Sequence, residues 1–151
     1  EKLVSNLSDK TASVREEVSA CLDVWSTVLG PESVFPFIID RLKQDNFDLR
    51  NEILKFIKKY KEMAYYNLKP EMKESLVGPL LGCLLDKNTA IRQAADEVIA
   101  YTTKFIPINS FITQAKEYKQ AVYNAVYPIL EKYIETHHSE NVEATEESPE
   151  D

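Results

Sequence analysis

A short sequence motif recurs along this chain. It reads DKTASVR at residues 9–15 and DKNTAIR at residues 86–92, with a weaker copy, QDNFDLR, at residues 44–50. The arginines that close the three copies lie 35 and 42 residues apart. Repeats of this period are typical of arrays of helical hairpins, in which each hairpin buries its apolar face only against its neighbours. The repeat therefore favours a stacked helical array, and a role in binding over a role in catalysis.

Composition and apolar spacing predict an all-α fold. Of the 151 residues, 44% are hydrophobic and only three are glycine, which favours helices over a sandwich or barrel. Apolar residues recur at steps of three and four, as one face of a helix requires. We expect a right-handed α-solenoid of three to four hairpins, with helices near 14–29, 31–43, 48–63, 70–85, 90–105 and 120–136.

Single residues refine this prediction. A short additional helix should begin at Ile108, and Trp25, on the apolar stripe of the first long helix, is expected to be a core side chain. Pro36 should kink the helix at 31–43, and Pro128 should interrupt the last one.

The charge distribution divides the chain into two parts. Residues 135–151 contain seven acidic side chains and no lysine or arginine, whereas residues 1–134 contain 18 residues of each sign. The net charge of −7 therefore comes from the end of the chain. A segment of one charge sign with few apolar residues does not bury enough surface to order itself. We expect a helical array over 1–134 and a disordered acidic tail or linker over 135–151.

The motif has a structural interpretation. Acceptors in each loop, which follows Asp9 or Asp86, can cap the exposed N–H groups of the next helix. The closing arginines can pair with an aspartate of their own or a neighbouring repeat, so that charges form a ladder along one edge. We interpret five residues as structural on this basis: Asp9, Arg15, Arg50, Asp86 and Arg92.

The sequence offers no catalytic, metal or cofactor site. Cys21 and Cys83 each lie within an apolar helical pattern, outside any paired metal-binding spacing. No nucleophile with its base, phosphate-binding glycine loop or carboxylate pair can be assembled, so an enzyme is disfavoured. A neutral body with an anionic tail offers no broad surface for nucleic-acid phosphates, and no apolar run reaches membrane-spanning length. We expect no catalytic residue, metal, cofactor, nucleic acid or membrane partner.

The hairpins resemble the HEAT repeat, with a proline in the first helix (Pro36, Pro79), an aspartate or its substitute before the loop, and an aliphatic residue followed by arginine after it. Residues 7–15, 21–25 and 42–54 look like the later repeats of a TOG domain, a module that occurs as tubulin-binding arrays in the microtubule polymerase family. Residues 84–92, with Phe111, Ala115 and 128–132, resemble that domain's final repeat and its C-terminal cap. The resemblance covers residues 3–134, and it implies that the chain is either the C-terminal part of a TOG domain or a divergent copy of one.

The resemblance also implies a function. The loops inside the hairpins would bind αβ-tubulin, and the protein would regulate microtubule dynamics in the cytoplasm and cytoskeleton, on microtubules, the spindle or a microtubule-organising centre. The loop positions that match the family, which we call the loop edge, are Lys10, Thr11, Asn46, Phe47, Lys87 and Asn88. The two lysines could instead merely solvate turns, and Phe47 could fold back onto Phe35 or Tyr60. The alternative is a generic HEAT scaffold or adaptor that binds another protein through its concave helices.

Overall fold

The structure, a computed structural model of the chain, describes residues 2–60 and 68–146, with side chains as far as Glu135. Every regular element in these residues is a helix, which confirms the predicted all-α fold. The chain divides into two compact units, Glu1–Ile106 and Pro107–Asp151, and each is described by itself. All three copies of the motif fall in the first unit.

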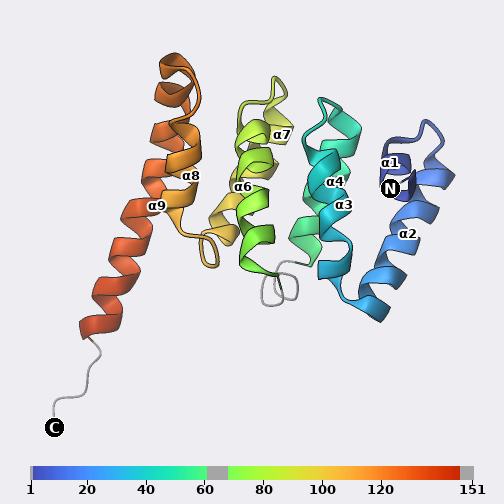
Figure 1. The fold of residues 1–151 in the computed structure, drawn as a ribbon, viewed down its shortest axis with the longest axis horizontal. Helices are drawn as coiled ribbons and strands as arrows, with labels where there is room; N and C mark the ends of the chain where they lie inside the picture. Colours follow the sequence, from blue (N-terminus) through green and yellow to red (C-terminus); the bar gives the residue numbers. More distant parts are fainter. Residues whose placement is uncertain (1, 61–67, 147–151) are drawn as a thin grey trace, which may run out of the picture. The chain divides into compact units, whose positions relative to one another are not determined.

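In its described residues, the first unit forms three helical hairpins, each running from a first arm through a short polar loop into a second arm. The first arms are α1 (Lys2–Ser5) with the 3-10 turn η1 (Asn6–Ser8), η2 (Pro31–Ser33) with α3 (Phe35–Leu42), and α6 (Pro70–Leu84). The second arms are α2 (Ala12–Leu29), α4 (Phe47–Lys59) and α7 (Thr89–Thr102). In Figure 1 these hairpins lie side by side and turn their internal loops toward the same edge.

The hairpins share an apolar core. Because α3 packs against α6 and α4 packs against α7, the second and third hairpins bury one another's apolar faces. The side chains that do so follow the expected helical spacing and are completely buried or nearly so: Phe35, Ile38, Leu42, Leu49, Ile53, Ile57, Leu76, Leu80, Ile91 and Ala95. This shared core holds the loops of the second and third hairpins at a fixed spacing.

The prediction for residues 31–43 is wrong in one respect. The segment forms two elements rather than one kinked helix, since η2 ends at Ser33 and α3 begins at Phe35. Pro36 lies in the first turn of α3, where its missing N–H leaves no helical hydrogen bond unmade. It therefore starts a helix instead of kinking one. The predicted end of the next helix, at residue 63, lies outside the described residues.

The second unit is one hairpin, formed by α8 (Ile108–Ala115) and α9 (Gln120–Glu146). Its buried side chains are Phe111, Ala115, Val126, Leu130 and Tyr133. The helix passes through Pro128 without a break, which overturns the predicted interruption. It also continues beyond the predicted end, so residues 135–146 of the expected acidic tail are helical. No glycine or proline, the two residues least compatible with a helix, occurs in this segment before Pro149.

Trp25 is half-buried, not a full member of the core. Its ring lies 5.6 Å from that of Phe37 in α3, which is itself 36% exposed. Leu22, three residues earlier on the same stripe, is 1% exposed. The apolar stripe of α2 thus runs out of the core toward the end of the helix, which the spacing of apolar residues alone does not reveal.

Leu49 and Phe47 provide a test of this packing. Leu49 is 2% exposed, and Leu49→Ala is expected to lower the free energy of unfolding by about 2–5 kcal/mol because it leaves a cavity. Phe47 is 44% exposed, so Phe47→Ala should cost less than about 1 kcal/mol. Urea unfolding followed by circular dichroism measures both values. Equal losses for the two variants would contradict the packing described.

Candidate functional site: the loop edge

The loop of the first hairpin is closed by the two ends of its motif. The Oδ1 atom of Asp9 accepts a hydrogen bond from the backbone N–H of Thr11 at 2.8 Å. Arg15 then reaches back and donates from Nη1 to the carbonyl oxygen of Asp9 at 2.6 Å. An aspartate side chain commonly supports a turn in this way, by bonding the backbone two residues on. The motif thus encodes its own loop.

The loop of the third hairpin repeats this geometry. Asp86 accepts from the backbone N–H of Asn88 at 2.7 Å, and Arg92 donates from Nη1 to the carbonyl oxygen of Asp86 at 2.8 Å. Arg92 also bonds the carbonyl of Lys87 at 3.1 Å and the Thr89 hydroxyl at 2.9 Å. Arg92 and the Oδ1 atom of Asp86 thus close the loop of the third hairpin.

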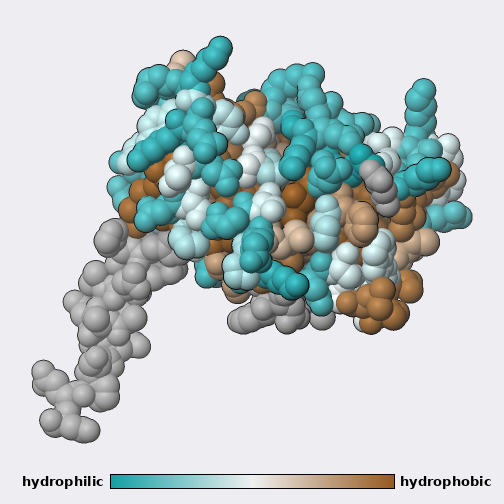
Figure 2. Space-filling model, in the orientation of Figure 1, coloured by the Kyte–Doolittle hydropathy of each residue, from teal (hydrophilic) through white to brown (hydrophobic). Residues whose placement is uncertain are grey.

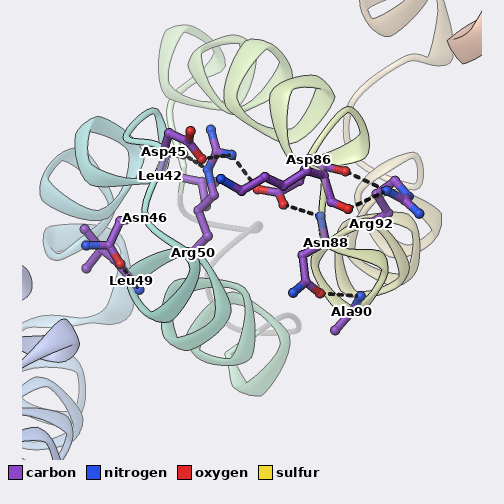
Figure 3. A network of polar contacts seen from close by, with 10 residues as sticks. Leu42, Asp45, Asn46, Leu49, Arg50, Asp86, Asn88, Ala90 and Arg92 are labelled. Atoms are coloured by element: carbon purple, nitrogen blue, oxygen red, sulfur yellow. Dashed lines mark hydrogen bonds and ion pairs between the residues drawn. The ribbon is translucent and has the colours of Figure 1, made fainter. Parts of the chain in front are cut away.

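The middle loop differs, because Gln44 stands where the other copies have aspartate. Its arginine, Arg50, donates from Nε to the carbonyl oxygen of Leu42 at 3.2 Å. Its Nη1 atom lies 2.6 Å from Oδ2 of Asp86 in the neighbouring hairpin and 3.8 Å from Oδ1 of Asp45 (Figure 3). One arginine therefore joins the loops of the second and third hairpins, which is the ladder contact that the repeat predicts.

Burial makes the Arg50–Asp86 pair an important contact. The two residues are 9% and 7% exposed, and both carboxylate oxygens of Asp86 accept hydrogen bonds. Burial by itself raises the pKa of Asp86. The hydrogen bonds from the Asn88 N–H and from Arg50, together with the charge of Arg50, outweigh that effect, so the pKa lies below its ordinary value of 3.8. The carboxylate is thus held in its charged form.

Two residues of the loop edge act as helix caps. The side-chain oxygen of Asn46 accepts from the N–H of Leu49 at 3.0 Å, and that of Asn88 accepts from the N–H of Ala90 at 2.9 Å. An asparagine in this position stabilises the helix start by satisfying an otherwise free N–H group. Thr11 occupies the same place before α2 but makes no such side-chain bond. The sequence predicted that loop acceptors cap these helices, and the structure identifies Asn46 and Asn88 as two of them.

The outward face of the loop edge consists of exposed side chains. Lys10, Thr11, Lys87 and Asn88 are exposed, and Phe47, the first residue of α4, is 44% exposed. Phe47 is therefore not a core side chain, unlike Phe35, which is fully buried. Lys10 and Lys87 hold equivalent positions, five residues before the arginine of their repeat.

Two features of this face were not predicted. In the middle loop, Asp45 occupies the position of the two lysines, so the positive charge along the edge is interrupted. Leu85, next to the Arg50–Asp86 pair, is 38% exposed although it continues an apolar run. The helical spacing of apolar residues could have predicted the exposure of Leu85, because Leu84 occupies the buried position and the next residue points away from the core.

The chemistry of the edge suits binding. It combines separated positive charges with an exposed aromatic ring, on loops whose backbones are fixed by internal hydrogen bonds. Among the described side chains, no group of three or more histidine, cysteine, aspartate or glutamate residues is placed to hold a metal ion. No helix in that part of the chain has the length and apolar character needed to cross a bilayer.

Comparison with known proteins gives one partial similarity. Over 94 residues, or 62% of its length, the chain is 34% identical to Zygote defective protein 9 of Caenorhabditis elegans. The matched stretch spans 6% of that protein's length. No family model matches the chain. Membership of the TOG family therefore stays a prediction from the resemblance of residues.

Removing Arg50 should be strongly destabilising. Arg50→Ala leaves the buried carboxylate of Asp86 without its charge partner, and such a change typically costs about 3–5 kcal/mol. The matched control is Lys55→Ala, because Lys55 also pairs with an acidic residue but is exposed, and it should cost no more than about 0.5 kcal/mol. Chemical denaturation measures both losses. Similar values for the two variants would show that the pair does not join the hairpins.

The Asp86 carboxylate also predicts a pH dependence. Since its pKa is lower in the folded chain than in the unfolded one, it contributes stability that is fully present above the ordinary value of 3.8. That contribution is lost as the pH falls through the lowered pKa. The difference in unfolding free energy between the wild type and Asp86→Asn should therefore shrink between about pH 5 and pH 2. Urea titrations at several pH values measure it, and a constant difference would contradict the assignment.

Proposed function

We propose that the chain is a TOG-like binding module that engages αβ-tubulin through the loop edge and helps to regulate microtubule dynamics. The observation that carries the proposal is the row of Lys10, Phe47 and Lys87, exposed on three loops that lie at one edge. The resemblance of the three motif copies to TOG repeats supports the choice of partner. The same proposal includes a HEAT-type solenoid fold. It also includes a location in the cytoplasm on microtubules, the spindle or a microtubule-organising centre.

The charge pattern suggests how such a partner would be recognised. Lys10 and Lys87 lie at the two ends of the row, while Asp45 and Asp48 flank Phe47 in the middle. A partner that matches this pattern carries acidic groups opposite the outer loops and an apolar recess opposite the central one. Charges arranged in this way raise the association rate and fix the register, and a central aromatic side chain supplies most of the affinity.

Charge reversal tests the proposal. Gel filtration of the chain with soluble αβ-tubulin, and a parallel titration, should give co-elution for the wild type. Lys10→Glu/Lys87→Glu should weaken the association at least about tenfold, which is about 1.4 kcal/mol, and the loss should shrink as salt screens the contact. Phe47→Ala should weaken it to a similar extent with little dependence on salt.

The matched control reverses the same amount of charge elsewhere. Lys69 and Lys104 are exposed at the ends of α6 and α7 that lie away from their shared loop. Lys69→Glu/Lys104→Glu should bind tubulin as the wild type does, with an unchanged circular dichroism spectrum for every variant. Equal affinity of the folded Lys10→Glu/Lys87→Glu chain and the wild type would rule out the loop edge as the tubulin site.

One observation favours the alternative, a HEAT scaffold for another protein. A hollow of about 170 Å³ lies between α2 and α4, and it is lined by Leu7, Ser19, Leu22, Asp23, Glu52, Lys55, Phe56 and Lys59. Its size suits one apolar side chain of a partner. Binding that tolerates charge reversal on the loop edge but is lost when Ser19→Arg fills the hollow would identify this second mode.

A further inference from the structure

The hollow of about 170 Å³ between α2 and α4 is built from one face of each helix. The residues that line it are Leu7 from η1, Ser19, Leu22 and Asp23 from α2, and Glu52, Lys55, Phe56 and Lys59 from α4. Within each helix they follow one another at steps that keep them on one face. The hollow is separate from the hydrophobic surface over the end of α2 in Figure 2, because the exposed residues Val28 and Leu29 do not line it.

The floor of the hollow is apolar. It is formed by the buried residues among those that line it, Leu7, Leu22 and Phe56. A cavity of roughly 150 Å³ with apolar walls binds a benzene molecule. The hollow is therefore large enough for one side chain of the size of leucine, which would exchange contact with water for contact with this floor.

The register of the motif explains why this space exists. Counted from the closing arginines, Ser19 of α2 occupies the position that Leu54 has in α4. Leu54 is 1% exposed, and α4 packs directly against α7. At this position α4 therefore supplies a buried leucine, whereas α2 supplies only a short and exposed serine. The hollow lies where the leucine side chain is missing.

Charged side chains surround the opening, and the two lysines are the most exposed of them. Lys55 and Lys59 are 65% and 58% exposed, whereas Glu52 and Asp23 are 34% and 36% exposed. Lys59 pairs with Asp23 at 2.9 Å, while Lys55 lies 3.4 Å from Glu52 on the same helix. An exposed pair such as Lys55–Glu52 contributes little, so Lys55 can turn toward a carboxylate of a partner.

We propose that the hollow is a docking site for an acidic peptide segment of another protein, which inserts one leucine and places a carboxylate beside Lys55. The missing leucine defines the apolar part of this ligand, and the outermost lysines define the sign of its charge. An apolar anchor in a fitted recess supplies most of the affinity in such contacts, and complementary charges around it fix the register. The site gives the second binding mode a partner of defined chemistry, and it does not depend on tubulin binding by the loop edge.

Selection from a random peptide library displayed on phage tests the proposal. The library is first passed over immobilised Ser19→Leu chain, and the peptides that the wild-type chain then retains are sequenced. The substitution fills the hollow with the residue that α4 has at this position, so it removes the site while leaving the rest of the surface in place. We expect the peptides specific to the wild type to share a leucine flanked by aspartate or glutamate.

A synthetic copy of the most enriched peptide separates the two parts of the site. In fluorescence anisotropy, Ser19→Leu should weaken binding at least about tenfold, because the leucine of the peptide no longer enters. Lys55→Gln should weaken it about threefold, and this loss should disappear at high salt. Ala20→Leu is the matched control, since it adds the same side chain at an exposed position of α2 that does not line the hollow, and it should bind as the wild type does. Lys10→Glu/Lys87→Glu, on the loop edge, should also bind the peptide unchanged.

Three results would overturn the proposal. The first is that no peptide distinguishes the wild type from Ser19→Leu, and the second is that the specific peptides are basic or lack a large apolar residue. The third is a dimer in analytical ultracentrifugation that Ser19→Leu abolishes, because a second copy would then be the occupant. Circular dichroism checks the fold of each variant. If Ser19→Leu does not fold, Lys55→Gln decides, because an unchanged affinity and salt dependence would rule out the contact with a carboxylate.

Discussion

The buried ion pair between Arg50 and Asp86 links the loops of the second and third hairpins above the apolar core that the two hairpins share. Both charged groups are buried away from water, and the cost of burying each charge is offset only while the other charge stays in place. The contacts that join second arms elsewhere, Lys58–Glu97 and Lys59–Asp23, involve side chains that are a third or more exposed, and such pairs contribute little. Among the described contacts, the interior pair therefore carries most of the electrostatic coupling between hairpins.

This coupling separates the roles of neighbouring residues within one short motif. Asp86 and Arg50 turn inward and join the hairpins, while Asn46 and Asn88 cap the helices that follow their loops. Lys10, Lys87 and Phe47 are exposed and make none of these contacts. Because the backbone of each loop is held by several hydrogen bonds, its exposed side chains can meet a partner without ordering the loop first. The scaffold and the recognition surface thus come from alternate positions of the same seven residues.

Much of this arrangement could be predicted from the sequence, because the motif is local and repeated. The all-α hairpins and the pairing of arginine with aspartate follow from spacing, whereas the exposure of Phe47 was one of two possibilities that the sequence left open. The direction of Arg50 toward the neighbouring hairpin did not follow, because the sequence left open whether each arginine pairs with an aspartate of its own or of a neighbouring repeat. The half-burial of Trp25 depends on what lies beyond the end of α2, and the length of α9 depends on local helix propensity that outweighed the uniform charge. Each miss concerns a property set by neighbours distant in sequence or by a balance of two opposing terms.

Gln44 has a consequence for the first hairpin. In the third loop, the carboxylate of Asp86 pairs with the arginine of the preceding hairpin. The middle loop has Gln44 at that position and so offers no carboxylate to Arg15, which bonds the carbonyl of its own Asp9. The first and second hairpins are joined instead through Asp23, Lys59 and Tyr60, toward the other end of the helices. There burial, together with the hydrogen bond and the nearby charge of Asp23, raises the pKa of Tyr60 to about 12. The hollow between α2 and α4 lies on this side as well. A buried contact thus fixes the distance between the loops that carry Phe47 and Lys87. The loop that carries Lys10 is held to the second hairpin by polar contacts near the other end of the helices. A partner that spans all three loops must therefore itself contribute to positioning the first loop.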